Sequence, residues 1–162
     1  GYNLQLSTNN QYIVDYSIHQ SSTDTATLTP HLEDHKEQYG SYPEVVVADA
    51  GYGSEQNYSY LEDNSMEGYV KYNYFDKDQH DAYKKKHPFA PSQLHYNREQ
   101  DVYYCPMGQQ MHSIGTATQM TATGYKQSVT RYQAANCEGC PLRGACHKSK
   151  HNRVIELSLI HI

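Results

Sequence analysis

Four cysteines have a spacing that is typical of metal binding. Cys137, Cys140 and Cys146 follow a C-x2-C-x5-C pattern, and Cys105 lies upstream as a fourth thiol. A C-x2-C step places two sulfurs on one turn, where both can bind one tetrahedral ion, and a reducing compartment favours metal binding over disulfides. The pattern predicts a structural zinc site and leaves an iron–sulfur cluster and free or redox-active thiols as alternatives.

Two histidines and several cations accompany these cysteines. His147 or His151 can replace Cys105 as a metal ligand. A folded metal-binding knuckle that presents cations is suited to contact DNA phosphates, because phosphate contacts dominate affinity for nucleic acid. The alternative is that each cation is merely solvated. The predicted DNA-binding residues are Arg131, Arg143, Lys148, Lys150 and Arg153.

Charge is distributed unevenly along the 162 residues. Residues 1–66 hold one basic side chain, Lys36, against ten acidic ones, whereas residues 67–162 hold twelve basic against eight acidic ones. The net charge of −5 taken alone argues against a large nucleic-acid surface. Any contact with phosphates is therefore expected in the second half of the chain.

A single carboxylate, Asp49, stands at the end of a short apolar run. Residues 44–48 read Glu-Val-Val-Val-Ala, which predicts a strand buried on both faces. Open α/β sheets place their chemistry at the carboxyl ends of strands, and Gly51 and Gly53 let the chain turn sharply there. The pattern predicts a site at Asp49. The alternative is that Asp49 only caps the following turn.

The elements expected around Asp49 alternate between strand and helix patterns. Two period-two stretches with a turn at residues 9–11 predict a β-hairpin. A helix near residues 24–39 is expected to begin with Thr29 as N-cap and Pro30 as first residue, and to end at Gly40. The other predicted elements are the hairpin strands 2–6 and 12–18, the strand 44–48, a helix capped by Ser54 that runs to about Asn64, and a strand at 68–72.

From about residue 73 the character of the sequence changes. Residues 76–91 are polar and contain two prolines, which predicts a boundary or a long excursion. Strand-like stretches follow at 94–96, 102–104 and 120–132, before the cysteines. The second half is therefore predicted to be a small β-rich module, and no run of apolar residues is long enough to span a membrane.

Several stretches resemble the central part of bacterial insertion-sequence transposases of the DDE type. The similarity covers about residues 1–155, and it indicates the branch with a cysteine-bearing insert between the second and third acidic residues. Its most specific element is Ala-Asp-Ala-Gly-Tyr at residues 48–52. The other matching stretches are Gly-Tyr-Asn-Leu-Gln at 1–5, Tyr12-Ile13-Val14, Asp24, Gly53-Ser54 and Asn57-Tyr58.

The resemblance implies an α/β fold, a partial RNase H-like mixed sheet interrupted by a small Cys-rich β insert. Residues 1–73 would form the partial catalytic core, residues 74–157 the insert, and residues 158–162 a truncation artefact. Asp49 would be the second of three catalytic acids. The first Asp would precede this chain and the third acid, a Glu, would follow it, so the chain is expected to be an internal fragment.

The implied activity is metal-dependent cleavage and transfer of DNA strands at insertion-sequence ends, with Asp49 as a ligand of Mg²⁺ or Mn²⁺. With one acid of three the chain is expected to be inactive alone, and Asp24 is interpreted as a helix or turn cap. Expected partners are DNA and, in the intact protein, further copies of itself; the expected location is the cytoplasm, at the nucleoid. The alternative function is a stand-alone zinc-binding interaction module without catalysis.

Overall fold

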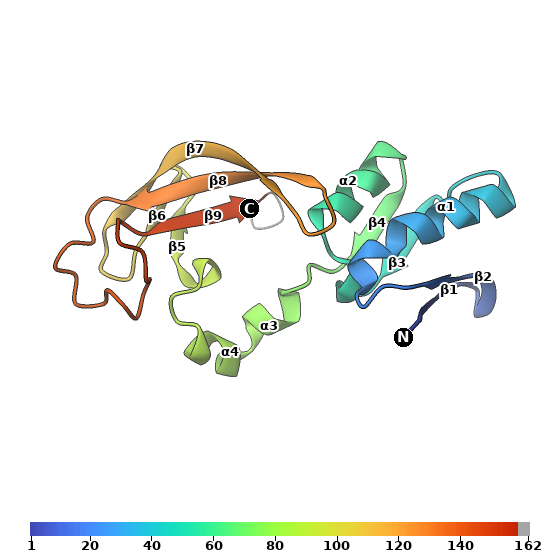
Figure 1. Ribbon diagram of the computed structural model, residues 1–162, viewed down its shortest axis with the longest axis horizontal. Helices are drawn as coiled ribbons and strands as arrows, with labels where there is room; N and C mark the ends of the chain where they lie inside the picture. Colours follow the sequence, from blue (N-terminus) through green and yellow to red (C-terminus); the bar gives the residue numbers. More distant parts are fainter. Residues whose placement is uncertain (159–162) are drawn as a thin grey trace. The chain divides into compact units, whose positions relative to one another are not determined.

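The computed structural model describes residues 1–158 and gives a mixed α/β protein of two compact units, residues 1–76 and 77–162 (Figure 1). The predicted truncation artefact at 158–162 lies, apart from Ser158, outside the described residues. No helix within the described part of the chain is long and apolar enough to cross a membrane.

The first unit opens with the predicted hairpin, formed by β1 (Asn3–Asn9) and β2 (Tyr12–His19). Its two turn residues, Asn10 and Gln11, both have positive φ, as a type I′ hairpin turn requires. The hairpin buries its polar face, which carries Gln5, Asp15 and Ser17. Its apolar face is exposed and consists of Leu4, Leu6, Tyr16 and Ile18.

The first helix, α1 (Leu28–Tyr39), starts four residues after the predicted bound at residue 24 and two residues before Pro30, the predicted first helical residue. A short 3₁₀ helix, η1 (Asp24–Ala26), precedes it, and Thr27 rather than Thr29 occupies the N-cap position. Pro30 is tolerated in the first turn because the first N–H groups of a helix have no partner within the helix. Gly40 ends the helix as predicted, in a left-handed conformation with its N–H donating to the carbonyl of Lys36 at 2.8 Å.

A buried histidine joins α1 to the hairpin. His31 is 6% exposed, and its Nε2 and Nδ1 each lie 2.6 Å from a serine hydroxyl, Ser7 Oγ on β1 and Ser17 Oγ on β2. Burial lowers the pKa of His31, against the raising effect of the nearby Asp15 carboxylate. The neutral imidazole therefore suits this position, because it can accept one hydrogen bond and donate the other.

A parallel pair of strands follows, β3 (Val45–Ala48) and β4 (Glu67–Val70), connected by α2 (Glu55–Asp63). Ser54 caps α2 as predicted, with Oγ accepting from the N–H of Asn57 at 3.2 Å. The prediction that β3 is buried on both faces is wrong: Val46 is 8% exposed, but Val47 is 77% exposed. The inward face packs in the core of the first unit, with Leu28, Leu32, Leu61 and Met66.

The predicted polar excursion contains short helices that the sequence did not reveal. These are α3 (Phe75–Gln79), α4 (Asp81–Lys86) and the 3₁₀ helix η3 (Pro91–Gln93). Each is short, and α3 and α4 are dominated by polar residues, so no apolar periodicity marks them in the sequence.

The second unit contains a five-stranded antiparallel sheet in which strand order follows chain order, β5 to β9 (Figure 1). The stretch predicted at 120–132 is not one strand, because Thr121–Tyr125 is the turn of a hairpin between β7 and β8. Met111, which is 0% exposed, lies at the centre of the core with Tyr103, Tyr132, Ile155 and Leu157. The strands are β5 (His95–Asn97), β6 (Val102–Tyr104), β7 (Gln110–Met120), β8 (Lys126–Ala134) and β9 (Val154–Ser158).

Candidate functional site

Asp49 lies directly after β3, at the carboxyl end of the parallel pair. It is the N-cap of the 3₁₀ helix η2 (Ala50–Tyr52), and its Oδ1 accepts a hydrogen bond from the N–H of Gly51 at 2.7 Å. The side chain is exposed, and its Oδ2 has no hydrogen bond among the described residues. Asp49 thus caps the turn and also keeps one carboxylate oxygen for a ligand.

A second carboxylate, Asp24, reaches the same place. A Cβ added at Gly51 would lie 2.9 Å from Asp49 Oδ1 and 3.0 Å from Asp24 Oδ2. The interpretation of Asp24 as a cap is wrong, because its Oδ1 accepts instead from Asn3 Nδ2 at 2.8 Å and from Gln5 Nε2 at 3.5 Å. Side chains of β1 hold Asp24 in position, and a side chain at position 51 would require one or both carboxylates to shift.

A buried asparagine fixes the loops that carry the two acids. Asn57 on α2 is 1% exposed, and its Nδ2 donates to the carbonyl of Thr25 at 2.9 Å and to that of Tyr52 at 2.7 Å. Thr25 Oγ1 also donates to the carbonyl of Gly51 at 3.0 Å. Through these bonds the segment after Asp24 and the segment after Asp49 are tied to the same helix.

Both carboxylates affect the pKa of a neighbouring tyrosine. The pKa of Tyr52 is raised, first by its burial and then by the negative charges of Asp24 and Asp49. Its hydroxyl stays protonated and donates to Oε1 of Gln5, which in turn contacts Asp24. The site is therefore a pair of carboxylates held by neutral donors, with no cation bound to either acid by an ion pair among the described residues.

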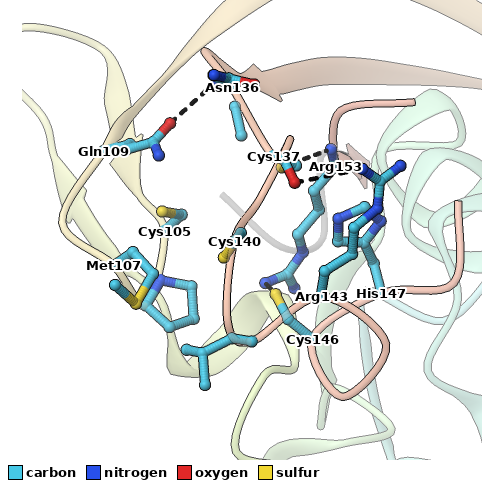
Figure 2. A pocket seen from close by; sticks show the side chains of 13 residues that line it. Cys105, Met107, Gln109, Asn136, Cys137, Cys140, Arg143, Cys146, His147 and Arg153 are labelled. Atoms are coloured by element: carbon cyan, nitrogen blue, oxygen red, sulfur yellow. Dashed lines mark hydrogen bonds between the residues drawn. The ribbon is translucent and has the colours of Figure 1, made fainter. Parts of the chain in front are cut away.

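Strand register explains why the four cysteines of the second unit lie around one place. Met111 pairs with Ala134, so the β6–β7 turn that contains Cys105 lies beside the chain leaving β8. That chain is the β8–β9 loop, which carries Cys137, Cys140 and Cys146. Gln109 Oε1 accepts from the N–H of Asn136 at 3.0 Å and joins turn to loop (Figure 2).

All four thiols line one small cavity of about 20 Å³. None of them forms a disulfide. His147 lines the same cavity, whereas the other candidate ligand, His151, lines a separate surface groove. Both ring nitrogens of His147 are buried without a hydrogen-bond partner, and burial, followed by the charges of Arg143 and Arg153, lowers its pKa.

Neither the acids nor the cysteines form a finished metal site in this structure. Within residues 1–158, no group of three or more His, Cys, Asp or Glu side chains is arranged so that it could hold a metal ion. The donor chemistry nevertheless fits two different ions. Carboxylates suit Mg²⁺, which binds through one or two of them together with phosphate oxygens, and thiolates suit Zn²⁺.

The five predicted DNA-binding residues have different surroundings. Arg153 is buried, and Arg143 donates to three backbone carbonyls, those of Cys137, Ser149 and Lys150. Arg131 forms an ion pair with Glu156, with 3.2 Å between Nε and Oε1. Lys148 and Lys150 are exposed and have no acidic partner within the described residues. These two lysines are the cations best placed to meet an external anion.

Sequence reasoning missed three residues that build these sites. Asp24 and Asn57 belong to stretches that carry the family resemblance, but their roles depend on contacts with residues more than 20 positions away. The sequence predicts Arg153 to bind DNA, since charged residues are almost never fully buried unless they are paired, whereas the structure buries it. The position of Arg153 close to the cysteine pattern in the sequence is the only signal of a role at the cysteine cavity.

By fold the chain is a mixed α/β protein, with a carboxylate pair in one unit and a cysteine cluster in the other. Residues 104–160, about a third of the chain, match the family model described as Transposase DDE domain. The match is consistent with a fragment of a DDE transposase. It includes all four cysteines and does not include Asp49. No curated protein and no solved structure matches the chain.

Proposed function

We propose that this chain is part of a DDE transposase and that Asp49 is a metal ligand of its catalytic site. The single observation that carries the proposal is the position of Asp49, at the carboxyl end of a parallel strand with a second carboxylate, Asp24, beside it. The matched family and the resemblance of residues 48–52 support the same activity.

The chemistry of DNA strand cleavage and transfer explains why carboxylates are needed. The attacking and leaving oxygens both carry charge in the transition state, and bound Mg²⁺ or Mn²⁺ stabilises that charge. Asp49 Oδ2 and the carboxylate of Asp24 would hold the ion. Because the ion also needs DNA phosphates and further acids, we expect this chain alone to bind it weakly and to cut no DNA.

The exposed apolar surface of the first unit supports a larger catalytic domain. Leu4, Leu6, Tyr16 and Ile18 on the hairpin and Val47 on β3 are all more than half exposed. The two strand pairs form separate two-stranded sheets here, and exposed apolar side chains on a sheet face are available to be covered by another element. We propose that the hairpin and the β3–β4 pair belong to one RNase H-like sheet, into which the β5–β9 unit is inserted.

Binding of Mn²⁺ to the 162-residue chain tests the role of Asp49. Mn²⁺ broadens the NMR signals of nearby nuclei, so we expect loss of the amide signals of Asp24, Asp49 and Gly51 on titration. Asp49→Asn removes the charge but keeps an oxygen that can cap η2. It should raise the concentration of Mn²⁺ needed at least about tenfold, which corresponds to about 1.4 kcal/mol.

The matched control is Asp63→Asn, because Asp63 is an exposed acid at the end of α2. This variant should titrate like the unmodified chain. If Asp49→Asn and the unmodified chain bind Mn²⁺ equally, or if broadening is spread over all exposed acids, Asp49 is not a metal ligand. In the intact transposase, Asp49→Asn should abolish excision of the element.

We further propose that Lys148 and Lys150 contact DNA phosphates, since they are exposed and without acidic partners. A DNA substrate would place the protein at the nucleoid, and the intact enzyme would act there as a homo-oligomer. These two lysines lie in the segment that matches the transposase family model.

A second candidate function is metal binding without catalysis, by the cysteine cluster alone. The observation that favours it is the convergence of all four thiols on one cavity, with no disulfide among them. Such a module would bind one equivalent of zinc and would give no Mn²⁺ response at Asp49. The two functions are compatible in one chain, because the acids and the cysteines lie in different units.

A further inference from the structure

Arg153 is buried at the base of the cysteine cavity without a carboxylate partner. It is 6% exposed, and no ion pair joins it to an acidic residue among those described. Its guanidinium donates to the sulfur of Cys146 at 3.0 Å (Figure 2). It also donates to the carbonyl oxygen of Phe89. Burying an unpaired charge is costly, so a cation in this position calls for a nearby anion.

The groups that can supply the anion are the thiols around it. Arg153 contacts two of them: its backbone N–H donates to Cys137 Sγ at 3.3 Å, and its Nη1 donates to Cys146 Sγ at 3.0 Å. Four thiolates around Zn²⁺ carry a net charge of −2. A buried guanidinium would offset half of that charge, and its N–H groups would orient two of the sulfurs.

We propose that Cys105, Cys137, Cys140 and Cys146 bind one structural zinc ion and that Arg153 is the positioning residue that compensates its charge. This inference rests on the proposed metal-binding role of the cysteine cluster. All four cysteines line the same cavity, and thiolates are ligands that suit Zn²⁺. In this proposal the four thiolates complete the tetrahedral site, and His147, which lines the same cavity, is not a ligand.

The site also explains how the loop is attached to the rest of its unit. Arg153 comes directly before β9, and its second contact is to Phe89, which lies between α4 and η3. One side chain therefore links the metal loop, the start of the last strand and the segment before the sheet. Removing its charge should affect zinc affinity more than removing a surface arginine, because residues that contact metal ligands typically change affinity 10- to 100-fold.

The test measures zinc in the 162-residue chain, purified under reducing conditions. We expect one zinc per chain, and Co²⁺ in its place should give a sulfur-to-cobalt absorption whose intensity corresponds to four thiolates. Cys105→Ser should lower that intensity to the value for three thiolates, and His147→Ala should leave it unchanged. A chain that holds iron and sulfide in place of zinc, or no metal, overturns the zinc site and with it the role of Arg153, and the absence of any metal also overturns the metal-binding function of the cluster.

Arg153 is tested by competition for zinc with a coloured chelator. Arg153→Gln should weaken zinc binding at least about tenfold, and Arg153→Lys, which keeps the charge, should recover part of the loss. Arg131→Gln is the matched control and should bind zinc like the unmodified chain. If the unmodified chain binds zinc but neither Arg153 variant loses affinity, the role of Arg153 is wrong and the metal site stands. If Arg153→Gln does not fold, Arg153→Met, which keeps the length of the side chain without its charge, takes its place, and wild-type zinc affinity in that variant overturns the role.

Discussion

Asp24 and Asp49 bring carboxylate oxygens to within 3.0 Å of one point beside Gly51, although 25 positions separate them in the chain. A Cβ at position 51 would lie 2.9 Å from the Asp49 oxygen and 3.0 Å from the Asp24 oxygen, so the carboxylates would have to shift to admit it. The segment that follows each acid is tied to Asn57 by a hydrogen bond. This arrangement makes Gly51 a sensitive point for stability and for metal binding.

Gly51→Ala should therefore destabilise the first unit and weaken Mn²⁺ binding together. Overpacking of this kind costs about 1–3 kcal/mol, and the two carboxylates must move apart to admit the methyl group. Urea unfolding and Mn²⁺ titration of the same variant measure the two effects. A variant with unchanged stability and unchanged Mn²⁺ affinity would show that the carboxylates do not crowd Gly51.

The buried His31 should make stability depend on pH. Burial lowers the pKa of His31 in the folded state, while in the unfolded chain the imidazole has its ordinary pKa of about 6.5. Between these two values the unfolded chain binds the extra proton, so stability falls as the pH decreases below about 6.5, by at most about 1.4 kcal/mol per pH unit. The loss is complete once the pH is below the folded-state value.

Urea unfolding at a series of pH values checks this dependence. His31→Gln should be less stable at pH 7.5 and should lose most of the slope between pH 6.5 and lower values. His112→Gln is the control, because His112 is exposed on β7. If the free energy of unfolding of His31→Gln changes with pH as steeply as that of the unmodified chain, groups other than His31 cause the pH dependence.

Truncation of Met111 should be the most costly single change in the core of the second unit. Its side chain is fully buried, and Met→Ala in a core typically costs about 2–5 kcal/mol through lost burial and an unfilled cavity. Met120→Ala, at a side chain that is 63% exposed on the same strand, should change stability by less than about 0.5 kcal/mol. Thermal unfolding of the two variants measures both losses of stability. Equal losses of stability would contradict the placement of Met111 in the core.

Replacing both Lys148 and Lys150 with alanine should weaken DNA binding equally for all sequences. Each lost phosphate contact should also reduce the slope of log K against log salt by about 0.9. Fluorescence anisotropy with duplexes of unrelated sequence, at several salt concentrations, measures both effects. Lys126→Ala on β8 is the control. If the double variant binds DNA as tightly as this control, Lys148 and Lys150 are not part of the DNA interface.

The sequence by itself determined the local elements whose signals lie within a few residues. Ser54 predicted the start of α2, Gly40 predicted the end of α1, and the alternation around residues 9–11 predicted the hairpin, since caps and turns depend on neighbouring side chains and backbone angles. The spacing of three cysteines likewise singled out the β8–β9 loop. The resemblance at residues 48–52 singled out Asp49.

Tertiary structure alone decided which distant groups meet and which faces are buried. Asp24 joins Asp49 through β1 and Asn57, and Cys105 joins the other cysteines because Met111 pairs with Ala134. The run at Val45–Val47 is apolar throughout, yet only Val46 is buried, since burial depends on what packs against each face. Such contacts are set by strand register and long-range packing, which are not written in the types of adjacent residues.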